Sequence, residues 1–346
     1  MKLSARAKRI VGMTMLIVTT MLWGTAFAIL KETLSQLPTF FILALRFFPS
    51  GVIIGLISIK RFRGISRRTV LHGLILGVVL FFAYGTQTFG LRYTTPARNA
   101  FITVAYCILT PFMVWAMYRR RPRSYNVISA VVCMVGLAFI SLIGQGDDGG
   151  LHLLGDGLTF VGAIFFALQL VFIEQFIERG DDPMILLFFE LTFAGALFGV
   201  VSASYEIPTL GLAAFAITPD LIWKLIYLMI GCSLLAQLFQ MLGQRYTTSS
   251  QAGIILSFES VFAALFSVFM GMENLTAFLI VGFALVFAAG LISELHLDPV
   301  LLVRRLLHRE GPAEETPSAS SSSTVSSDSV DTPSSSSAPN GDDDVI

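Results

Sequence analysis

The stretch Gly243-Gln-Arg-Tyr-Thr-Thr248 repeats, with one difference, the stretch Gly90-Leu-Arg-Tyr-Thr-Thr95 in the first half of the chain. Arg245 stands 153 residues after Arg92 (245 − 92), and each stretch leads from the end of one apolar run into the next. Such a recurrence indicates duplication. Because duplicated hydrophobic halves are typical of carriers, the repeat predicts a membrane protein built from two related halves.

The composition supports a membrane location. Of 346 residues, 55% are hydrophobic and only 13% are charged, whereas soluble proteins carry about 25% charged residues. A net charge of +0 disfavours a nucleic-acid partner. The three cysteines lie in apolar runs and the four histidines are scattered, so we expect no metal site and no cofactor.

Ten segments are long and apolar enough to span a bilayer, which requires about 20 mostly apolar residues. The pattern predicts an all-α integral membrane protein with an N-terminus (1–9), two five-helix halves (10–143 and 154–295) and a tail (310–346). Because five is odd, the halves cross in opposite senses and form inverted repeats. The predicted spans are Ile10–Leu30, Pro38–Ile59, Thr69–Leu91, Pro96–Tyr118, Asn126–Ile143, Leu154–Phe176, Met184–Ser204, Leu221–Gly243, Ser250–Gly271 and Leu275–Leu295.

Lysine and arginine are distributed unevenly among the connections, and this bias predicts orientation because basic residues collect on the cytoplasmic side. With the N-terminus inside, 18 of the 23 basic residues are cytoplasmic and 4 are outside, which leaves Arg46 within a span. Ten spans return the C-terminus to the cytoplasm. We therefore expect a multi-pass protein of the plasma (inner) membrane, surrounded by lipid, with both termini cytoplasmic.

The tail has a different composition from the spans. From Glu314 to Ile346 the chain is rich in serine and contains proline and aspartate. Such a segment buries too little apolar surface to offset the entropy lost on ordering. We expect it to be disordered.

Two charged residues stand inside predicted spans at equivalent positions of the halves. Arg46 in the second span and Glu190 in the seventh are 144 residues apart (190 − 46). A charge near the bilayer centre costs about 2.5–3.5 kcal/mol on insertion scales, so it faces a cavity or a partner. The two residues would either lie on opposite sides of one substrate site, or form a mutual salt bridge or bonds to backbone carbonyls.

Paired glycines accompany these charges at the same offset, Gly51 and Gly55 in one half and Gly195 and Gly199 in the other. Small residues four apart let helix backbones approach closely in lipid. We interpret them as packing devices. They allow a homodimer, but packing within a monomer explains them equally well.

A second buried carboxylate, Glu259, lies near the middle of the ninth span, and its counterpart in the first half is Tyr106 (259 − 106 = 153). Burial disfavours the charged form of a carboxylate unless a cation is near. Glu259, with Glu190, is therefore a candidate for proton coupling or for binding a substrate amine. A neutral, hydrogen-bonded structural role explains it equally well.

Uncharged side chains would complete a pocket. Gln87 and Gln240 correspond at the offset of 153 (240 − 87) and offer polar contacts within spans. Trp23 and Tyr106 would supply aromatic walls, although packing explains each of them as well. Pro111 is expected to kink the fourth span.

Several stretches resemble EamA-type members of the drug/metabolite transporter superfamily. They are Leu22-Trp-Gly-Thr-Ala-Phe27, Leu45-Arg-Phe47, Phe101-Ile-Thr-Val-Ala-Tyr106 through Pro111 to Arg120-Arg-Pro122, Leu256-Ser-Phe-Glu-Ser-Val-Phe-Ala-Ala-Leu265 and Gly271-Met-Glu-Asn-Leu-Thr276.

The resemblance covers roughly residues 10–295. It implies a ten-helix secondary carrier of two inverted repeats, with a central cavity lined by the first four helices of each half. It also implies export of amino acids, other metabolites or toxic compounds, often against a proton gradient. The family commonly has Glu-Pro in the ninth span, whereas Ser260 follows Glu259 here, so we expect a less kinked helix at this point.

We therefore predict a secondary active transporter, not an enzyme, that moves a small organic solute by alternating access, with export favoured. The predicted substrate-binding residues are Trp23, Arg46, Gln87, Tyr106, Glu190, Gln240 and Glu259. Two other classes stay open: a membrane enzyme acting on lipid, for which no catalytic cluster or nucleophile motif is visible, and a non-transporting receptor or assembly subunit.

Overall fold

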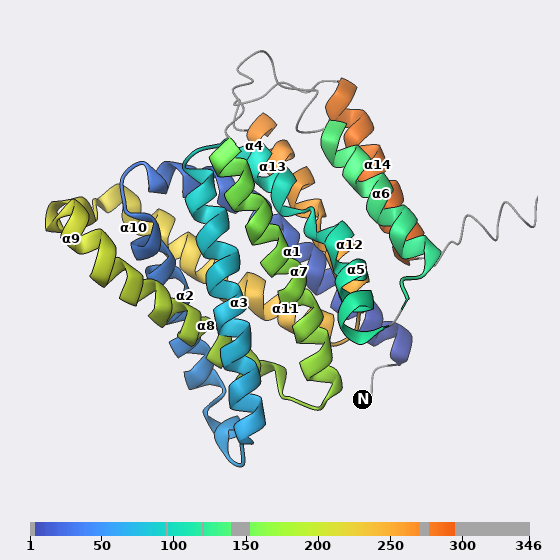
Figure 1. Ribbon diagram of the computed structural model, residues 1–346, viewed down its shortest axis with the longest axis horizontal. Helices are drawn as coiled ribbons and strands as arrows, with labels where there is room; N and C mark the ends of the chain where they lie inside the picture. The colour runs from blue at the N-terminus through green and yellow to red at the C-terminus, as the bar shows by residue number, and fades with distance from the viewer. Residues whose placement is uncertain (1–3, 95, 120, 140–152, 270–276, 295–346) are drawn as a thin grey trace, which may run out of the picture. The chain divides into compact units, whose positions relative to one another are not determined.

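The computed structural model describes residues 4–94, 96–119, 121–139, 153–269 and 277–294 (Figure 1). Among these residues every regular element is a helix and no strand occurs. The predicted tail, the start of the N-terminal segment, the ends of the fifth and ninth spans and both ends of the tenth lie outside the described residues. The helices are α1 (Ala5–Leu34), α2 (Thr39–Ile57), α3 (Arg67–Leu91), α4 (Pro96–Thr103), α5 (Tyr106–Tyr118), α6 (Ser124–Ala138), α7 (Leu153–Glu178), α8 (Pro183–Val201), α9 (Ile207–Leu210), α10 (Pro219–Ile226), α11 (Ala236–Gln244), α12 (Ser249–Leu256), α13 (Phe258–Phe269) and α14 (Ala277–Glu294).

Eight helical stretches among the described residues have the length and apolar composition to cross a membrane. They coincide with the first four predicted spans of each half. The fifth and tenth predicted spans contain shorter apolar helices, Ser124–Gly136 and Ile280–Ile292. These two lie in α6 and α14, which pack against each other at one edge of the bundle (Figure 1).

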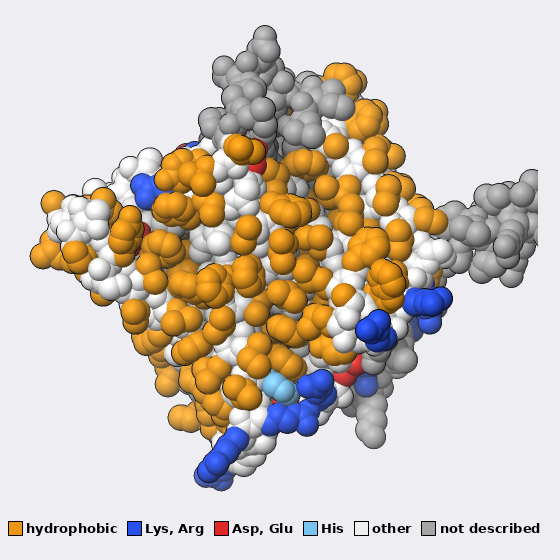
Figure 2. Space-filling view, in the orientation of Figure 1, with side chains coloured by type: hydrophobic (Ala, Val, Ile, Leu, Met, Phe, Trp, Pro, Cys, Tyr) orange, Lys and Arg blue, Asp and Glu red, His pale blue; other side chains and the backbone are white. Residues whose placement is uncertain are grey.

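The outward-facing side chains match a lipid environment. Figure 2 shows hydrophobic side chains over most of the visible face, with Lys and Arg gathered mainly at the end where α2 leads into α3. Large apolar side chains such as Leu56, Val200 and Phe269 are 65%, 63% and 84% exposed. Exposure of this extent over several helices suits a surface solvated by acyl chains.

Glycines bring α2 and α8 together where the two halves meet. A Cβ atom added to Gly51 would lie 2.6 Å from the backbone nitrogen of Thr192, and one added to Gly195 would lie 2.5 Å from the Cα of Phe48. Both pairs are related by 144 residues (195 − 51 and 192 − 48). One backbone contact therefore occurs twice, once from each half.

A second pair of contacts follows the same rule. A Cβ on Gly12 in α1 would lie 2.9 Å from the carbonyl oxygen of Gly243 in α11, and one on Gly90 in α3 would lie 2.7 Å from that of Gly155 in α7. The offsets are 143 for α1 and α7 (155 − 12) and 153 for α3 and α11 (243 − 90). The α1–α11 pair and the α7–α3 pair, which correspond in the repeat, thus cross at corresponding residues.

The repeated Arg-Tyr-Thr-Thr stretches form the turns that follow α3 and α11. Lys31 at the end of α1 donates to the carbonyl oxygens of Leu91 (2.6 Å) and Thr94 (2.9 Å) in the first turn. Its counterpart Glu174 (174 − 31 = 143) accepts from the backbone nitrogen of Ser249, 2.9 Å away, after the second turn. The residue equivalent to Ser249 is Pro96, which has no N–H to donate.

The fourth and ninth predicted spans are each interrupted near the middle of the bundle. After each interruption a backbone N–H closes a tight turn, from Cys107 to Val104 (2.9 Å) and from Ser260 to Ser257 (3.2 Å). These donors are also 153 residues apart (260 − 107). The interruption in the fourth span precedes Pro111, which lies inside α5.

The ninth span is interrupted at Ser257, between α12 and α13, without a proline. The Ser257 hydroxyl lies 2.6 Å from the carbonyl oxygen of Ile254 and 2.9 Å from the sulfur of Cys133. A serine hydroxyl that bonds locally competes with the helical hydrogen-bond ladder. This competition gives a physical reason for the break at Ser257.

The crossing of α2 and α8 yields a testable prediction. Gly195→Ala places a methyl group against the backbone of Phe48, so we expect it to destabilise the protein by about 1–3 kcal/mol. In Gly199→Ala, the nearest heavy atom is the Cβ of Ala44 at 4.0 Å, and stability should be unchanged or slightly higher. Thermal unfolding of both variants in one detergent tests this, and equal melting temperatures would contradict it.

Candidate functional site

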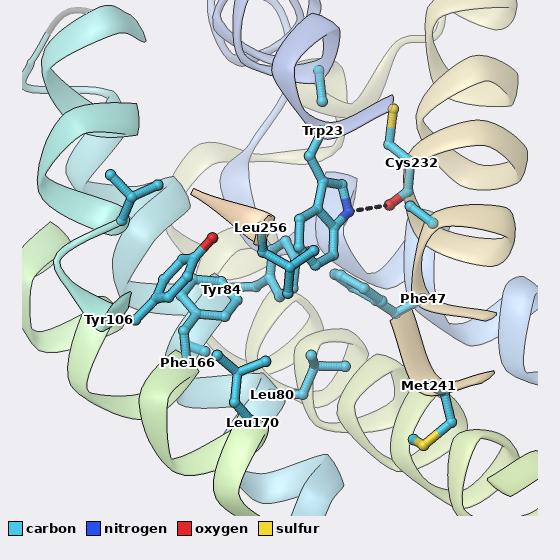
Figure 3. Packing of buried hydrophobic residues seen from close by; sticks show 14 of the residues in the cluster. Trp23, Phe47, Leu80, Tyr84, Tyr106, Phe166, Leu170, Cys232, Met241 and Leu256 are labelled. Carbon is cyan, nitrogen blue, oxygen red and sulfur yellow. Dashed lines mark hydrogen bonds between the residues drawn. The ribbon is translucent and has the colours of Figure 1, made fainter. Parts of the chain in front are cut away.

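A small cavity, with about 30 Å³ open to a water-sized sphere, lies among α1, α2, α3, α7, the α4–α5 break and the start of α13. Figure 3 shows aromatic rings of Trp23, Tyr84, Tyr106 and Phe166 grouped in the adjoining core. The cavity is lined by Trp23, Ala26, Phe27, Leu30, Arg46, Tyr84, Gln87, Thr103, Tyr106, Phe166 and Glu259.

The cavity brings together five of the seven predicted site residues: Trp23, Arg46, Gln87, Tyr106 and Glu259. Glu190 and Gln240 do not line it. The sequence reasoning gave no place in the site to Phe166 or Thr103. Phe166 is the counterpart of Trp23 (166 − 23 = 143), so the repeat offset of α1 and α7 could have identified it.

Arg46 is buried in the cavity wall without a carboxylate partner among the described residues. Its Nε donates to Ser233 Oγ at 3.1 Å, and its guanidinium lies over the rings of Phe47 (5.3 Å) and Tyr84 (5.6 Å). The salt bridge with Glu190 that the sequence left open does not form. A buried guanidinium held by a hydroxyl and two aromatic faces keeps donors for an anionic ligand.

A π-helical turn, Tyr227–Leu235, positions both Ser233 and Trp23. A π-turn interrupts the regular hydrogen-bond ladder and is frequent at functional sites. Here Trp23 Nε1 donates to the carbonyl oxygen of Cys232 at 3.0 Å, drawn in Figure 3. The thiol of Cys232 in turn donates to the carbonyl oxygen of Leu22 at 3.2 Å. The eighth span is therefore locked to α1 beside the cavity.

Two hydrogen bonds join residues that are equivalent in the two halves. Tyr106 Oη donates to Glu259 Oε1 at 3.4 Å, and Gln237 Nε2 donates to Tyr84 Oη at 3.2 Å, each pair being 153 residues apart. Equivalent residues can touch only where the two halves meet. Glu259, Tyr106 and Tyr84 therefore place the cavity at this boundary.

Gln87 belongs to a polar chain on the α3 side of the cavity. Its Nε2 donates to Thr103 Oγ1 at 3.0 Å. Its backbone carbonyl accepts from Asn99 Nδ2 at 3.1 Å, and Asn99 also donates to Thr159 Oγ1 at 2.7 Å. These bonds fix the amide of Gln87 at the cavity wall.

Glu190 and Gln240 are buried away from the cavity. Glu190 Oε1 accepts from Gln169 Nε2 at 2.6 Å, so α8 is joined to α7 at this point. Glu190 Oε2 and Gln240 Oε1 are buried and have no hydrogen-bond partner. The equivalent charges Arg46 and Glu190 thus occupy different surroundings in this structure.

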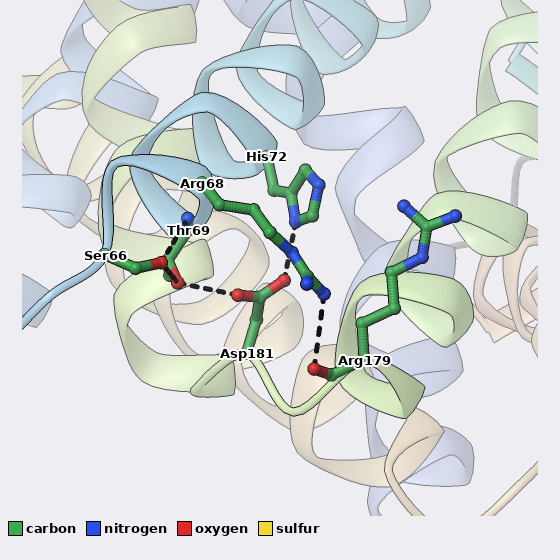
Figure 4. Close-up of polar contacts among 6 residues, drawn as sticks. All are labelled: Ser66, Arg68, Thr69, His72, Arg179 and Asp181. Carbon is green, nitrogen blue, oxygen red and sulfur yellow. Dashed lines mark hydrogen bonds and ion pairs between the residues drawn. The ribbon is translucent and has the colours of Figure 1, made fainter.

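A second, basic pocket of about 470 Å³ lies at the end of the bundle where α7 leads into α8, and its lining includes Arg61, Arg63, Arg68 and Arg179. Asp181 and Thr69 also line it, and buried Asp181 accepts from Thr69 Oγ1 and contacts His72 Nδ1, both at 2.6 Å (Figure 4). Arg68 donates to the carbonyl oxygen of Arg179 at 3.3 Å. This polar cluster joins the start of α3 to the α7–α8 connection.

The polar cluster predicts unequal effects of two substitutions at the same end. Asp181→Ala removes the acceptor of buried His72, at a cost of about 1–3 kcal/mol for the unpaired group, while the Thr69 hydroxyl keeps Ser66 Oγ as a partner at 2.9 Å. Arg61→Ala removes an exposed pair with Asp182 and should change stability by no more than about 1 kcal/mol. Thermal unfolding distinguishes them, and an equal loss in both variants would refute a structural role for Asp181.

Comparison with known proteins places these features in a family. The EamA-like transporter family matches twice, at residues 10–142 and 153–293. An uncharacterized transporter of Archaeoglobus fulgidus is 30% identical over 288 residues, which is 83% of this chain and 87% of that protein. A solved crystal structure at 18% identity superposes with a TM-score of 0.67 over 87% of this chain and 100% of its own, which supports the fold.

The family resemblance inferred from the sequence motifs is therefore confirmed. Apolar helices of spanning length and two family matches identify a multi-pass membrane protein. The chain belongs to the EamA-like transporter family.

Proposed function

We propose that this transporter is a secondary active carrier that moves a small organic metabolite across the plasma membrane by alternating access. The observation that carries the proposal is the cavity at the boundary of the halves, where a buried guanidinium and a buried carboxylate share one wall of aromatic rings. Concave, mostly apolar sites with a few fixed polar groups are typical of small-molecule binding.

The cavity chemistry favours an amino-acid-like solute. Arg46 would bind the carboxylate in a charge-assisted hydrogen bond, and Glu259 would meet the amine. Trp23 and Phe166 would pack against the side chain of the solute. Drug-like solutes with an amine and an apolar body fit the same walls without using Arg46.

We further propose that ten helices cross the membrane as two inverted halves with both termini cytoplasmic. The paired contacts of equivalent residues support the repeat, and the distribution of Lys and Arg supports the orientation. The glycine pairs contact helices of their own chain, so they give no separate support for a homodimer.

Export driven by proton uptake is the mode of transport that we propose. Glu259 lies in the cavity wall and Glu190 lies behind it, and both are buried carboxylates without a basic partner among the described residues. Such groups exchange a proton when their surroundings change between two states. The direction follows the family resemblance and is tested by transport in oriented vesicles.

Ligand-induced stabilisation tests the proposed site. A zwitterionic amino acid that binds should raise the thermal stability of the purified protein, by about 2.7 kcal/mol at 100 times its Kd. Arg46→Ala and Glu259→Gln should abolish the stabilisation. Arg61 pairs with Asp182 at the basic pocket, away from the cavity, so the control variant Arg61→Gln should retain it. The panel would include amino acids, nucleosides, sugars and amphiphilic cations.

Two results would contradict the proposal. Stabilisation that survives in both Arg46→Ala and Glu259→Gln would place the ligand elsewhere. A complete lack of stabilisation, together with a lack of transport in vesicles, would favour a non-transporting receptor or assembly subunit.

A further inference from the structure

Three buried side chains behind the cavity have oxygen atoms without hydrogen-bond partners. These atoms are Gln169 Oε1, Glu190 Oε2 and Gln240 Oε1, and the three residues are at most 1% exposed. An acceptor that is buried and unpaired costs about 1–3 kcal/mol, so a group of them in one region requires an explanation.

The three residues belong to one region of the interior. Gln169 and Glu190 are hydrogen-bonded at 2.6 Å, and α11 packs against both α7 and α8. Gln244, one turn after Gln240 on α11, donates to the carbonyl oxygen of Leu170, the residue next to Gln169. The same face of α11 that carries Gln240 is therefore directed at α7.

Each of the three residues is the repeat counterpart of a residue that lines the cavity. Gln169 corresponds to Ala26 (169 − 26 = 143), Glu190 to Arg46 (190 − 46 = 144) and Gln240 to Gln87 (240 − 87 = 153). Contacts between helices recur at the same offsets. Thr19 Oγ1 donates to the carbonyl oxygen of Ala236 at 3.1 Å, and at the equivalent positions a Cβ added to Gly162 would lie 3.0 Å from the carbonyl oxygen of Ala83.

Two inverted halves of one fold can exchange arrangements, and the exchange moves the opening of the site to the other face of the membrane. Residues equivalent to the cavity lining then become the cavity lining. The unpaired oxygens, closed off in this structure, would become accessible in the exchanged state and would meet water or substrate.

We propose that Gln169, Glu190 and Gln240 form a second subsite, closed in this structure, that lines the cavity when it opens to the opposite side and binds a cationic group. The inference rests on the proposed transport function and specifies it. Arg46 in one state is replaced by Glu190 in the other, so an anion-binding group gives way to a cation-binding group. A zwitterionic solute, bound in the first state through its carboxylate at Arg46 and its ammonium group at Glu259, would meet Glu190 with its ammonium group in the second state.

Cysteine accessibility tests the subsite in the full chain. The buried Cys107, Cys133 and Cys232 are first replaced by alanine, and then Gln169→Cys or its counterpart Ala26→Cys is introduced. Membrane vesicles of known orientation receive an impermeant cationic or anionic methanethiosulfonate from one side at a time. A folding control compares the melting temperature of each variant with that of its background.

The proposal predicts reaction of Ala26→Cys from one side only and of Gln169→Cys from the other side only. At position 169 the cationic reagent should react roughly tenfold faster than the anionic one, because Glu190 attracts it. Adding Glu190→Gln should remove this preference.

Other outcomes overturn the proposal at distinct levels. If Ala26→Cys reacts and folded Gln169→Cys does not, the second subsite is wrong while the cavity stands. Equal rates of the two reagents at position 169 refute the cationic ligand. If neither position reacts, the proposed transport cavity fails as well. Should Gln169→Cys not fold, Gln240→Cys and its counterpart Gln87→Cys repeat the comparison.

Discussion

In hydrocarbon, no water satisfies a backbone N–H or carbonyl group that leaves a helical ladder, and this constraint governs the interior of the protein. The helices are nevertheless irregular near the cavity: α4 is separated from α5, α12 from α13, and a π-turn interrupts the eighth span. At the π-turn and at the turns after α3 and α11, side chains from other helices bond backbone groups. Trp23 takes the carbonyl of Cys232, and Lys31 and Glu174 tie the turns after α3 and α11. The cavity thus lies where the backbone departs from regularity and where side chains support it.

The two halves share backbone geometry but differ in side-chain chemistry. Lys31 and Glu174 perform one task, tying a helix end to the following turn, with opposite charges and opposite hydrogen-bonding roles. Tyr106 and Glu259 occupy equivalent positions at the helix breaks and touch each other across the boundary. Glycine contacts, by comparison, keep their chemistry in both halves because any side chain there would collide with backbone. The duplicated scaffold thus keeps one backbone architecture while the residues that line the cavity have diverged between the halves.

Close packing and charge are separated in this protein. The crossing of α2 and α8 is apolar and depends on glycine, whereas Arg46 on the same α2 helix is directed toward the eighth span and the cavity. At the other site of high charge, the basic pocket, the carboxylates Asp181 and Asp182 have partners in His72 and Arg61. The Arg46 guanidinium and the Glu259 carboxylate lack such partners among the described residues. Among the described residues, these two buried charges without a charged partner therefore lie at the central cavity and not at the basic pocket.

The sequence by itself determined the all-helical membrane class, the family, the first four spans of each half and five residues that line the cavity. These follow from hydrophobic length, from intramembrane charge and from the repeat, all of which are visible along one chain. The interruption at Ser257, the π-turn beside Trp23 and the absence of a bond between Arg46 and Glu190 were decided only by tertiary structure. Each depends on partners from distant spans. The offset identifies two residues as equivalent in the repeat, but it does not determine whether their side chains are in contact. Tyr106 and Glu259 are in contact. Arg46 and Glu190 are not, because Arg46 on α2 bonds Ser233 in the eighth span and Glu190 on α8 bonds Gln169 on α7.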